Sequence, residues 1–325
     1  MNDSADSSTA PEVSVLLVNW NTREMTLDCL RSVYAQTTWT PFEVIVVDNG
    51  SGDGSAEAIA REFPQVRLMA EAVNHGFARA TNLQARAARA EKLLLLNTDT
   101  VVLDHAIDNL VAFSREHPEA RIWGGRTLYA DGSLNPTSCW GKMTFWTSFT
   151  FATGLSAAFP NSRLFNPRAY PGWRRDSIRR VDIVTGCLFL IDRDFWRELG
   201  GFDRRFFMFG EEADLCMRAA KKGARPMITP AATVIHYDGG STRSRAGKLI
   251  HTLSSTIGMI DDHFPPLGRG PSRHMIAAAA GIRALAYGLA AKLNRERFGD
   301  AAATWTEVWK RRREWRNGPI EAELG

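Results

Sequence analysis

The stretch that most constrains the fold is residues 93–102, LLLLNTDTVV. Four leucines, 93–96, form a continuous apolar run, and two valines lie a few residues beyond it. Such a run is typical of a strand that is buried on both faces in the middle of a parallel sheet. The polar triplet Asn97-Thr98-Asp99 interrupts the run where such a strand ends. Because ligands bind beyond the carboxyl ends of strands in open α/β sheets, Asp99 is predicted to face a crevice. The alternative is an ordinary turn, in which Asn and Asp bond to nearby backbone.

Apolar strands alternate with helical segments through the first third of the chain. Strands are predicted at 13–18, 42–47, about 66–69 and 93–96, with a helix in each interval between them. Short loops join these segments, which implies right-handed βαβ units and a parallel sheet whose polar strand ends gather on one edge. The fold class is therefore α/β, with a Rossmann-like, mostly parallel sheet flanked by helices. Another apolar strand is predicted at 181–190.

Three of these strand ends place Asn19, Asp48 and Asp99 at the same edge of the sheet. At the tip of the second strand, Asp48 can accept a hydrogen bond from a nucleobase or a ribose hydroxyl, or it can be a turn aspartate. Neither a G-x-G-x-x-G after the first strand nor a G-x-x-x-x-G-K-[ST] occurs. This argues against a dinucleotide-binding dehydrogenase and against a P-loop enzyme.

The composition is that of a globular protein without general affinity for nucleic acid. Of the 325 residues 44% are hydrophobic, and 40 Lys and Arg against 36 Asp and Glu leave a net charge of +4. The four cysteines are far apart, as expected for small buried side chains in a reducing compartment. No segment reaches the roughly 18–20 uninterrupted apolar residues of a membrane span. The nearest candidate, 275–291, is interrupted by Arg283.

The middle of the chain combines aromatic and basic residues. Residues 140–151 contain five aromatic side chains, and we expect them to belong to the core. Six arginines follow between 163 and 180, interleaved with aromatic residues that include Trp173. This segment is interpreted either as a solvated loop or as a mobile lid whose cations meet a phosphate-bearing ligand or the membrane surface.

Two later segments carry further polar candidates. Glu211, Glu212 and Asp214 fall in the first turn of a predicted helix that ends near Gly223. The helix dipole favours acids there, but three of them beside an aromatic run exceed what capping requires. His236, at the end of a strand, is either structural or a metal ligand.

With these residues in place, residues 11–245 resemble the family 2 glycosyltransferases, inverting enzymes of the GT-A fold, and in particular their rhamnosyltransferase-like branch. The resemblance is carried by the segments VSVLLVNWN, FEVIVVDNGSGDGS, NHGFARATN, LLLLNTDT, GGFDRRFFMFGEEADLCMR and VIHYDGGS. It implies that Glu212 is the catalytic base and that Asp99 and His236 bind a divalent metal, Mg²⁺ or Mn²⁺. It also implies nucleotide-sugar contacts by Asn19, Asn21, Asp48, Asn74, Gly76, Asn82 and Asn97. On the acceptor side we place Glu211, Asp214 and Trp173.

The chain departs from the family pattern at two of these positions. Asn97 stands where the metal motif has its first acid, so Asp99 is the only charged side chain in that motif. Glu212 stands where the base is usually Asp, a change of one methylene that a pocket can accommodate without a change of chemistry.

The implied function is transfer of a sugar to a hydroxyl of a cell-envelope or lipid-linked glycan, and the first candidate for the donor is dTDP-rhamnose. The alternatives are a nucleotidyltransferase and a non-catalytic protein that binds nucleotide sugars or glycans. The predicted division of the chain is a disordered tail (1–11), a GT-A domain (12–245, with a nucleotide-sugar half to 125 and an acceptor half from 126) and a helical extension (246–325).

The predicted location is the cytoplasm, including the inner face of the cytoplasmic membrane. The basic, Trp-rich residues 305–316 suit the interface of an anionic membrane, which would make the protein a peripheral one. Packing of the extension on the catalytic domain, or on a second copy in a homo-oligomer, is the alternative.

Overall fold

The computed structural model describes residues 10–237 and 244–319. The predicted tail at 1–11 lies almost wholly outside this range. One large sheet organises the molecule, and its strands follow one another across it in the order β3 (Arg67–Glu71), β2 (Phe42–Asn49), β1 (Val13–Asn19), β4 (Lys92–Leu96), β11 (Leu188–Asp192), β6 (Ile122–Leu128), β12 (Met227–His236) and β5 (Thr100–Val102). Short strands β7 (Leu134–Asn135) and β9 (Arg179–Arg180) pair at its margin, and β8 (Cys139–Trp140) pairs with β10 (Ile183–Val184).

The sheet is mostly parallel, as the sequence predicts. β3, β2, β1 and β4 run parallel to one another, and β6 pairs in parallel with β12. Only β11 and β5 run in the opposite direction along this order. The carboxyl ends of six strands therefore meet at one edge, together with the amino ends of β11 and β5.

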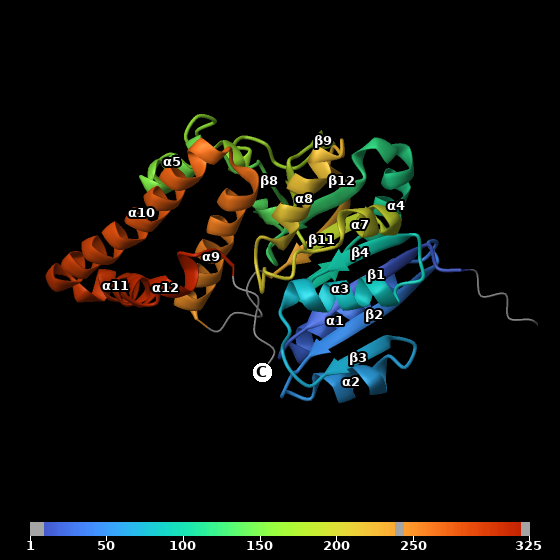
Figure 1. Cartoon of the computed structure of the whole chain (residues 1–325). Coiled ribbons are helices and arrows are strands. Elements are labelled where there is room, and N and C mark those ends of the chain that lie inside the picture. The colour runs from blue at the N-terminus through green and yellow to red at the C-terminus, as the bar shows by residue number, and fades with distance from the viewer. Residues whose placement is uncertain (1–9, 238–243, 320–325) are drawn as a thin grey trace, which may run out of the picture.

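Helices cover both faces of the sheet (Figure 1). One face is covered by α1 (Arg23–Gln36), α2 (Ser55–Glu62) and α4 (Ala106–Glu116), the other by α3 (Phe77–Ala87), α7 (Arg193–Leu199) and α8 (Glu211–Lys221). A hydrophobic core lies on each face of the sheet, and alternate residues of a strand point into the two cores. In β1, Val15 and Leu17 lie in one core and Leu16 lies in the other. This alternation follows from the two-residue period of a strand, and it explains why strands buried on both faces are continuously apolar.

The C-terminal helices form a lobe beside the sheet (Figure 1). It consists of α9 (Arg245–His263), α10 (Pro266–Leu293), α11 (Arg295–Lys310) and the short α12 (Arg312–Trp315), with α5 (Phe145–Ala152) packed on α10 and α6 (Leu155–Ala158) beside α5. A third core joins this lobe to the rest, since Met143 and Phe206 pack among residues of α9 and α10. Three short 3₁₀ helices, Pro118–Ala120, Pro136–Ser138 and Pro167–Ala169, complete the described elements.

Two expectations from the sequence need correction. The strand expected at 181–190 is split into β10 and β11, because Thr185 turns away to bond to the carbonyl groups of Ser138 and Thr137. The aromatic residues of α5 are not core: Phe145 is 51% exposed, whereas Thr147 and Thr150 on the opposite side of the helix are buried.

The tryptophans of the basic C-terminal stretch bear on the two alternatives given for it, a membrane interface and packing on protein. Trp315 is completely buried and donates its indole N–H to the carbonyl group of Val308. Trp305 and Trp309 pack against the same core cluster. These side chains hold the lobe together and do not form an exposed interface.

Candidate active site

The carboxyl edge of the sheet opens into a cavity of about 390 Å³. Several of the residues predicted from the sequence line it together, namely Asn74, Asn97, Asp99, Glu211, Glu212 and His236. Asp99 follows β4 in the first half of the chain, and Glu212 begins α8 in the second half. The sheet and the segment before α8 thus bring two acids that are far apart in sequence to the wall of one cavity.

Asp99 and His236 are held side by side by the pairing of β12 with β5. His236 pairs with Thr100, and the N–H of Tyr237 donates to the carbonyl oxygen of Asp99 at 3.0 Å. This places Nε2 of His236 3.3 Å from Oδ1 of Asp99. The other ring nitrogen, Nδ1, is buried and has no hydrogen-bond partner.

This pair fits a divalent cation that takes its remaining ligands from a substrate. Two ligands bound at about 2.1 Å and at right angles to each other stand about 3.0 Å apart, close to the distance between these atoms. Among the described residues, no group of three or more His, Cys, Asp or Glu is arranged to hold a metal. The amide of Asn97 lies beside the pair, 3.4 Å from His236 Nε2.

Glu211 and Glu212 stand at the amino end of α8, after Gly210 in a left-handed conformation (φ 93°). Burial, and after it the charge of Glu212, raises the pKa of Glu211 well above its usual value. Burial also raises the pKa of Glu212, against hydrogen bonds from backbone N–H groups that lower it. Oε2 of Glu211 has no hydrogen-bond partner. A carboxyl with a raised pKa in a cavity is suited to exchange a proton with a substrate.

Another part of the cavity wall is formed by Asn49 and Asn74, with Gly76 bonded behind it. The amide of Asn49 donates to Oδ1 of Asn74 at 2.9 Å, and the same oxygen accepts from the N–H of Gly76 at 2.8 Å. Gly76 has φ 79°, and a Cβ there would lie 2.5 Å from the carbonyl oxygen of Phe207. Glycine therefore allows the loop before α8 to approach this wall, where Phe207 accepts a hydrogen bond from Phe77.

Three predicted donor residues, Asn19, Asn21 and Asp48, are absent from the cavity lining and bond to the loop after β2 or to each other. Asn19 donates to Oδ1 of Asp48 at 2.5 Å, and Ser51 N–H donates to Oδ2 of Asp48 at 3.1 Å. Asn21 accepts from the N–H of Gly52. Asp48 is 3% exposed, so in this structure its carboxylate shapes the loop after β2. Its direct contact with a nucleobase stays a prediction.

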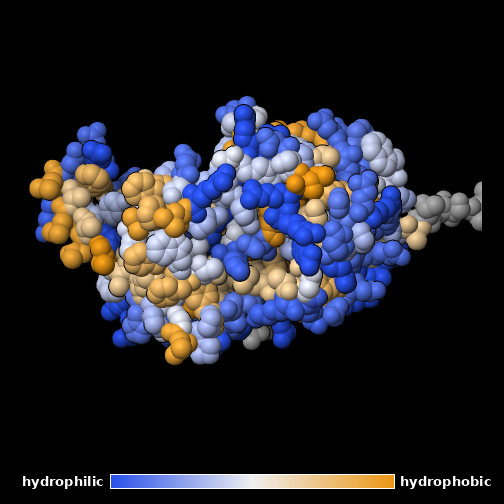
Figure 2. Space-filling view, turned by 90° about the horizontal axis from the view of Figure 1, so that it is seen from above, coloured by the Kyte–Doolittle hydropathy of each residue, from blue (hydrophilic) through white to orange (hydrophobic). Residues whose placement is uncertain are grey.

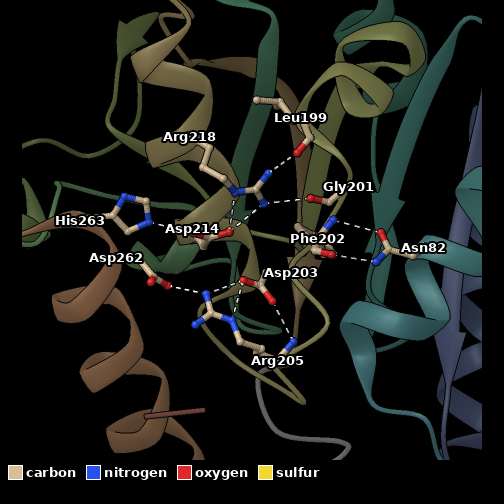
Figure 3. Close-up of polar contacts among 10 residues, drawn as sticks. All are labelled: Asn82, Leu199, Gly201, Phe202, Asp203, Arg205, Asp214, Arg218, Asp262 and His263. Atoms are coloured by element: carbon tan, nitrogen blue, oxygen red, sulfur yellow. Dashed lines mark hydrogen bonds and ion pairs between the residues drawn. The ribbon is translucent and has the colours of Figure 1, made fainter. Parts of the chain in front are cut away.

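Asn82, Asp214 and Trp173 lie away from the cavity lining. Asn82 forms two hydrogen bonds with the backbone of Phe202 (Figure 3). Trp173 donates to Ser177 Oγ at 3.1 Å and lies 4.8 Å below the guanidinium of Arg179. The arginine-rich segment packs on itself here. Contacts of Asn82, Asp214 and Trp173 with a donor or an acceptor stay predictions.

Asp214 joins the catalytic-site helix α8 to the C-terminal lobe (Figure 3). His263, the last residue of α9, donates from Nε2 to Oδ1 of Asp214 at 2.8 Å, and Arg218 donates from Nε to Oδ2 at 2.8 Å. Burial alone raises the pKa of Asp214, but the hydrogen bond from His263 and the charge of Arg218 outweigh it and lower the pKa. Arg218 also donates to the carbonyl groups of Leu199 and Gly201.

Sequence reasoning missed several residues of this site. Trp20, Thr137, Trp140, Thr185 and Lys248 also line the cavity. Trp20 follows the first strand, so its position was a usable signal. Lys248 and His263 lie in the C-terminal helices, where no motif marks them, and only the packing of α9 against α8 brings them here.

The chain matches a known protein family and several of its characterised members. The model of glycosyl transferase family 2 matches residues 14–182, which is more than half of the chain. The curated relatives include the N-acetylglucosaminyl-diphospho-decaprenol L-rhamnosyltransferase of Mycobacterium tuberculosis, 28% identical over 269 residues that cover 76% of this chain and 83% of that protein. The O-antigen biosynthesis protein RfbC of Myxococcus xanthus is 27% identical over 73% of this chain, which spans only 18% of that longer protein.

Solved structures show the same fold. The mannosyltransferase PcManGT from Pyrobaculum calidifontis, in complex with GDP-Man and Mn²⁺, aligns with a TM-score of 0.53 at 18% identity over 94% of this chain and 87% of its own. GalNAc-T7 with UDP, GalNAc and Mn²⁺ aligns with a TM-score of 0.53 at 15% identity over 79% of this chain and 52% of its own. The predicted GT-A fold is therefore confirmed. The chain belongs to glycosyl transferase family 2, and it is a glycosyltransferase of the hexosyltransferase class.

Proposed function

We propose that the chain transfers a hexosyl group to a hydroxyl of a cell-envelope or lipid-linked glycan, with inversion at the anomeric carbon and with a divalent metal. The first candidate for the donor is dTDP-rhamnose, which would supply rhamnose. The observation that carries the proposal is that Asp99, His236 and Glu212 line one cavity. Its size, about 390 Å³, is in the range of small-molecule sites. The choice of rhamnose rests on the likeness to the mycobacterial relative, which is named a rhamnosyltransferase.

On the donor side, Asp99 and His236 would hold the cation, and the wall of Asn74 and Gly76 would receive the sugar nucleotide. A bound Mg²⁺ or Mn²⁺ would supply charge neutralisation for the diphosphate leaving group. Lys248 lies in the same cavity and would add a second positive charge toward the diphosphate. Asp48, Asn19 and Asn21 would keep the adjoining loop in shape.

On the acceptor side, Glu212 would take the proton of the attacking hydroxyl. The hydroxyl oxygen would form a bond to the anomeric carbon on the face opposite the leaving diphosphate, so that the configuration inverts. One carboxylate base suffices, because no leaving alcohol has to be protonated as in glycoside hydrolysis. Glu211, which also lines the cavity, would orient the acceptor.

The donor is tested by incubating the purified chain with a panel of labelled nucleotide sugars, with Mn²⁺ or Mg²⁺ and then with a chelator. We expect release of nucleoside diphosphate, fastest with dTDP-rhamnose, and loss of release after chelation. Release of pyrophosphate from a nucleoside triphosphate would instead indicate a nucleotidyltransferase. Binding of a nucleotide sugar without turnover, in the presence of any acceptor tried, would indicate a binding protein.

The metal site is tested by Asp99→Ala. We expect the affinity for nucleoside diphosphate measured calorimetrically with Mn²⁺ to fall by two orders of magnitude or more, because the only carboxylate of the pair is lost. Affinity without metal should barely change. Asp194→Ala is the matched control, since that side chain is 90% exposed. An Asp99→Ala titration that matches the wild type with Mn²⁺ would remove Asp99 from the site.

A further inference from the structure

The solvent-facing row of α10 is apolar along the helix except at His274. Residues at successive intervals of three or four positions form one exposed line: Leu267, Pro271, His274, Ala278, Ile282, Leu285, Leu289 and Leu293. Leu267 and Leu293 at its two ends are 93% and 91% exposed, and Leu285 is 66% exposed. At about 1.5 Å per residue the row is about 40 Å long. A surface helix of a globular protein normally turns charged residues to this side.

Other sides of α10 pack against neighbouring helices, and its buried residues lie in its first half, at Ser272, Ile276, Ala277, Ala279 and Ala280. α9, α5 and α11 all pack on the helix. Gly281 lies under the ring of Trp309 of α11, and Arg283 donates to the carbonyl group of Phe151 of α5. The sequence holds no uninterrupted apolar run of membrane-spanning length, and no span is expected from it; within the described residues, however, α10 as a whole is the one helix long and apolar enough to cross a membrane. Because three other helices of the chain pack against it, α10 is placed to lie along a surface.

Aromatic side chains border the row on the side of α5. Phe145, Trp146 and Phe151 are between 40% and 51% exposed. Seen from above, hydrophobic side chains gather on the end of the molecule formed by the C-terminal lobe (Figure 2). Aromatic rings beside an aliphatic surface are typical of the interface between a bilayer and water.

A basic pocket borders the row on the side of α12. Its volume is about 400 Å³, and its lining includes Arg273, His274, Arg312, Arg313 and Arg316. His274 belongs to both the pocket and the exposed row. Arg273 is paired with Asp261, and Arg312 donates to the carbonyl group of Trp309. Arg313 and Arg316 are exposed at the mouth of the pocket. Guanidinium groups in this arrangement suit the oxygens of a phosphate.

The charge of the lobe agrees with an anionic partner. Residues 266–319 hold eleven Lys and Arg against four Asp and Glu, so this segment is more positive than the whole chain, whose net charge is +4. Cations stand at both ends of the apolar row, Arg313 and Arg316 near one end and Lys292 and Arg295 at the other.

From these observations we infer that the C-terminal lobe docks on an anionic phospholipid bilayer, with the exposed row of α10 in the acyl boundary and lipid phosphate groups in the pocket between α10 and α12. The helix would lie in the plane of the membrane. This inference deepens the proposed function, on which it rests for the lipid-linked acceptor: it names the surface that brings the cavity to the membrane.

A second copy of the chain is the competing occupant of this surface. Two apolar rows that met in either direction would bring cations against cations, because both ends of the row are basic. A bilayer containing anionic lipid neutralises both ends at once. The charge pattern therefore favours the membrane over self-association.

The experiment is flotation of the full chain with vesicles of phosphatidylcholine, alone or with 30% phosphatidylglycerol. Two sets of substitutions test the two parts of the surface. Ile282→Gln with Leu285→Gln and Leu289→Gln removes the middle of the row, and all three side chains are more than half exposed, so folding should be preserved. Arg313→Gln with Arg316→Gln weakens the pocket. Trp39→Gln, an exposed aromatic outside the lobe (61%), is the control.

We expect the wild type and the control to float with the anionic vesicles. The row variant should lose at least 100-fold in partitioning to either vesicle. The arginine variant should lose about five-fold per residue, only with anionic vesicles. A row variant that floats like the wild type, or a wild type that does not float, would overturn the inference. So would a dimer, measured by light scattering, that the row substitutions dissociate while no form binds vesicles.

Flotation needs no sugar transfer, and this separates the inference from the proposed function. Release of nucleoside diphosphate by a protein that does not bind vesicles would refute only the docking surface. Vesicle binding by a protein that turns over no nucleotide sugar would refute only the proposed reaction.

Discussion

At the scale of single residues, the cavity holds two neighbouring carboxyl groups whose burial opposes their ionisation. A catalytic base has to be ionised yet basic, and a raised pKa supplies the basicity. The position of Glu212 in the cavity was predictable because the acids at the start of α8 exceed what helix capping requires, and its role as the base stays a prediction. The partners of Asn82 and Asp214 were not predictable, because each binds a group 49 or 120 positions away along the chain.

Glu212→Gln should abolish most of the transfer, by 10²–10⁴-fold in kcat, because the amide cannot accept the hydroxyl proton. Affinity for nucleoside diphosphate, measured by calorimetry, should stay near that of the wild type. Glu24→Gln serves as the control, since its side chain is 74% exposed. A Glu212→Gln protein with turnover close to the wild type would place the base elsewhere.

The pH dependence of kcat/KM follows from the raised pKa of Glu212. The base works only when it is deprotonated, so activity should rise with pH through this pKa. The midpoint of the acidic limb should therefore lie above the ordinary glutamate value of 4.5. A pH profile of initial rates, with the donor kept at a fixed fraction of its KM, measures this midpoint. A midpoint at or below the ordinary value would contradict the assignment.

Glu211→Gln should stabilise the protein at neutral pH. The pKa of Glu211 is raised by burial, so the folded state binds its proton more tightly than the unfolded state does. The stability that this proton provides is complete below the unfolded pKa and is lost as pH rises through the folded pKa. A glutamine at this position carries no ionisable proton, so the substitution removes this loss of stability at neutral pH. We expect a Tm about 2 °C or more above wild type at pH 7.5, with the difference shrinking toward pH 4, in thermal unfolding monitored by circular dichroism.

At the scale of elements, α8 is the part of the site whose position depends on most of its neighbours. Asp214 ties it to α9 through His263, and Arg218 ties it to the turn at Leu199 and Gly201. Ser255 of α9 also donates to the carbonyl group of Phe209, just before α8 begins. The amino end of α8, with its two glutamates, is thus placed partly by its own motif and partly by α9, which lies outside the family motifs.

His263→Ala should therefore lower kcat while leaving the donor KM nearly unchanged, since α8 carries the proposed base, Glu212, and the proposed donor contacts lie on other elements. Stability should fall by about 2–4 kcal/mol, because Asp214 stays buried with one donor fewer. His263→Gln keeps an N–H donor and should recover part of kcat. Thr252→Ala, on the exposed side of α9, is the control. Equal losses in the Ala and Gln variants, or a loss confined to KM, would rule out the positioning role.

At the scale of the whole molecule, the sequence predicts the sheet well and the lobe poorly. The strands of residues 13–96 are strongly apolar and closely spaced, so their period and their loops specify parallel pairing. The C-terminal helices are Ala-rich, and such a helix can pack with almost any of its sides. Nothing in the local pattern of Trp309 or Trp315 indicates that these rings turn inward while the leucines of α10 turn outward.

The contact between His263 and Asp214 bears on how short an active form of this protein can be made. The segment that matches the family model ends at residue 182, before Glu211 and Glu212. A chain cut after β12 would keep both glutamates, but it would expose Phe206 and remove His263, which donates a hydrogen bond to Asp214. The smallest piece able to fold around its own reaction centre must therefore extend through Trp315, whose ring is sealed inside the last helical turns.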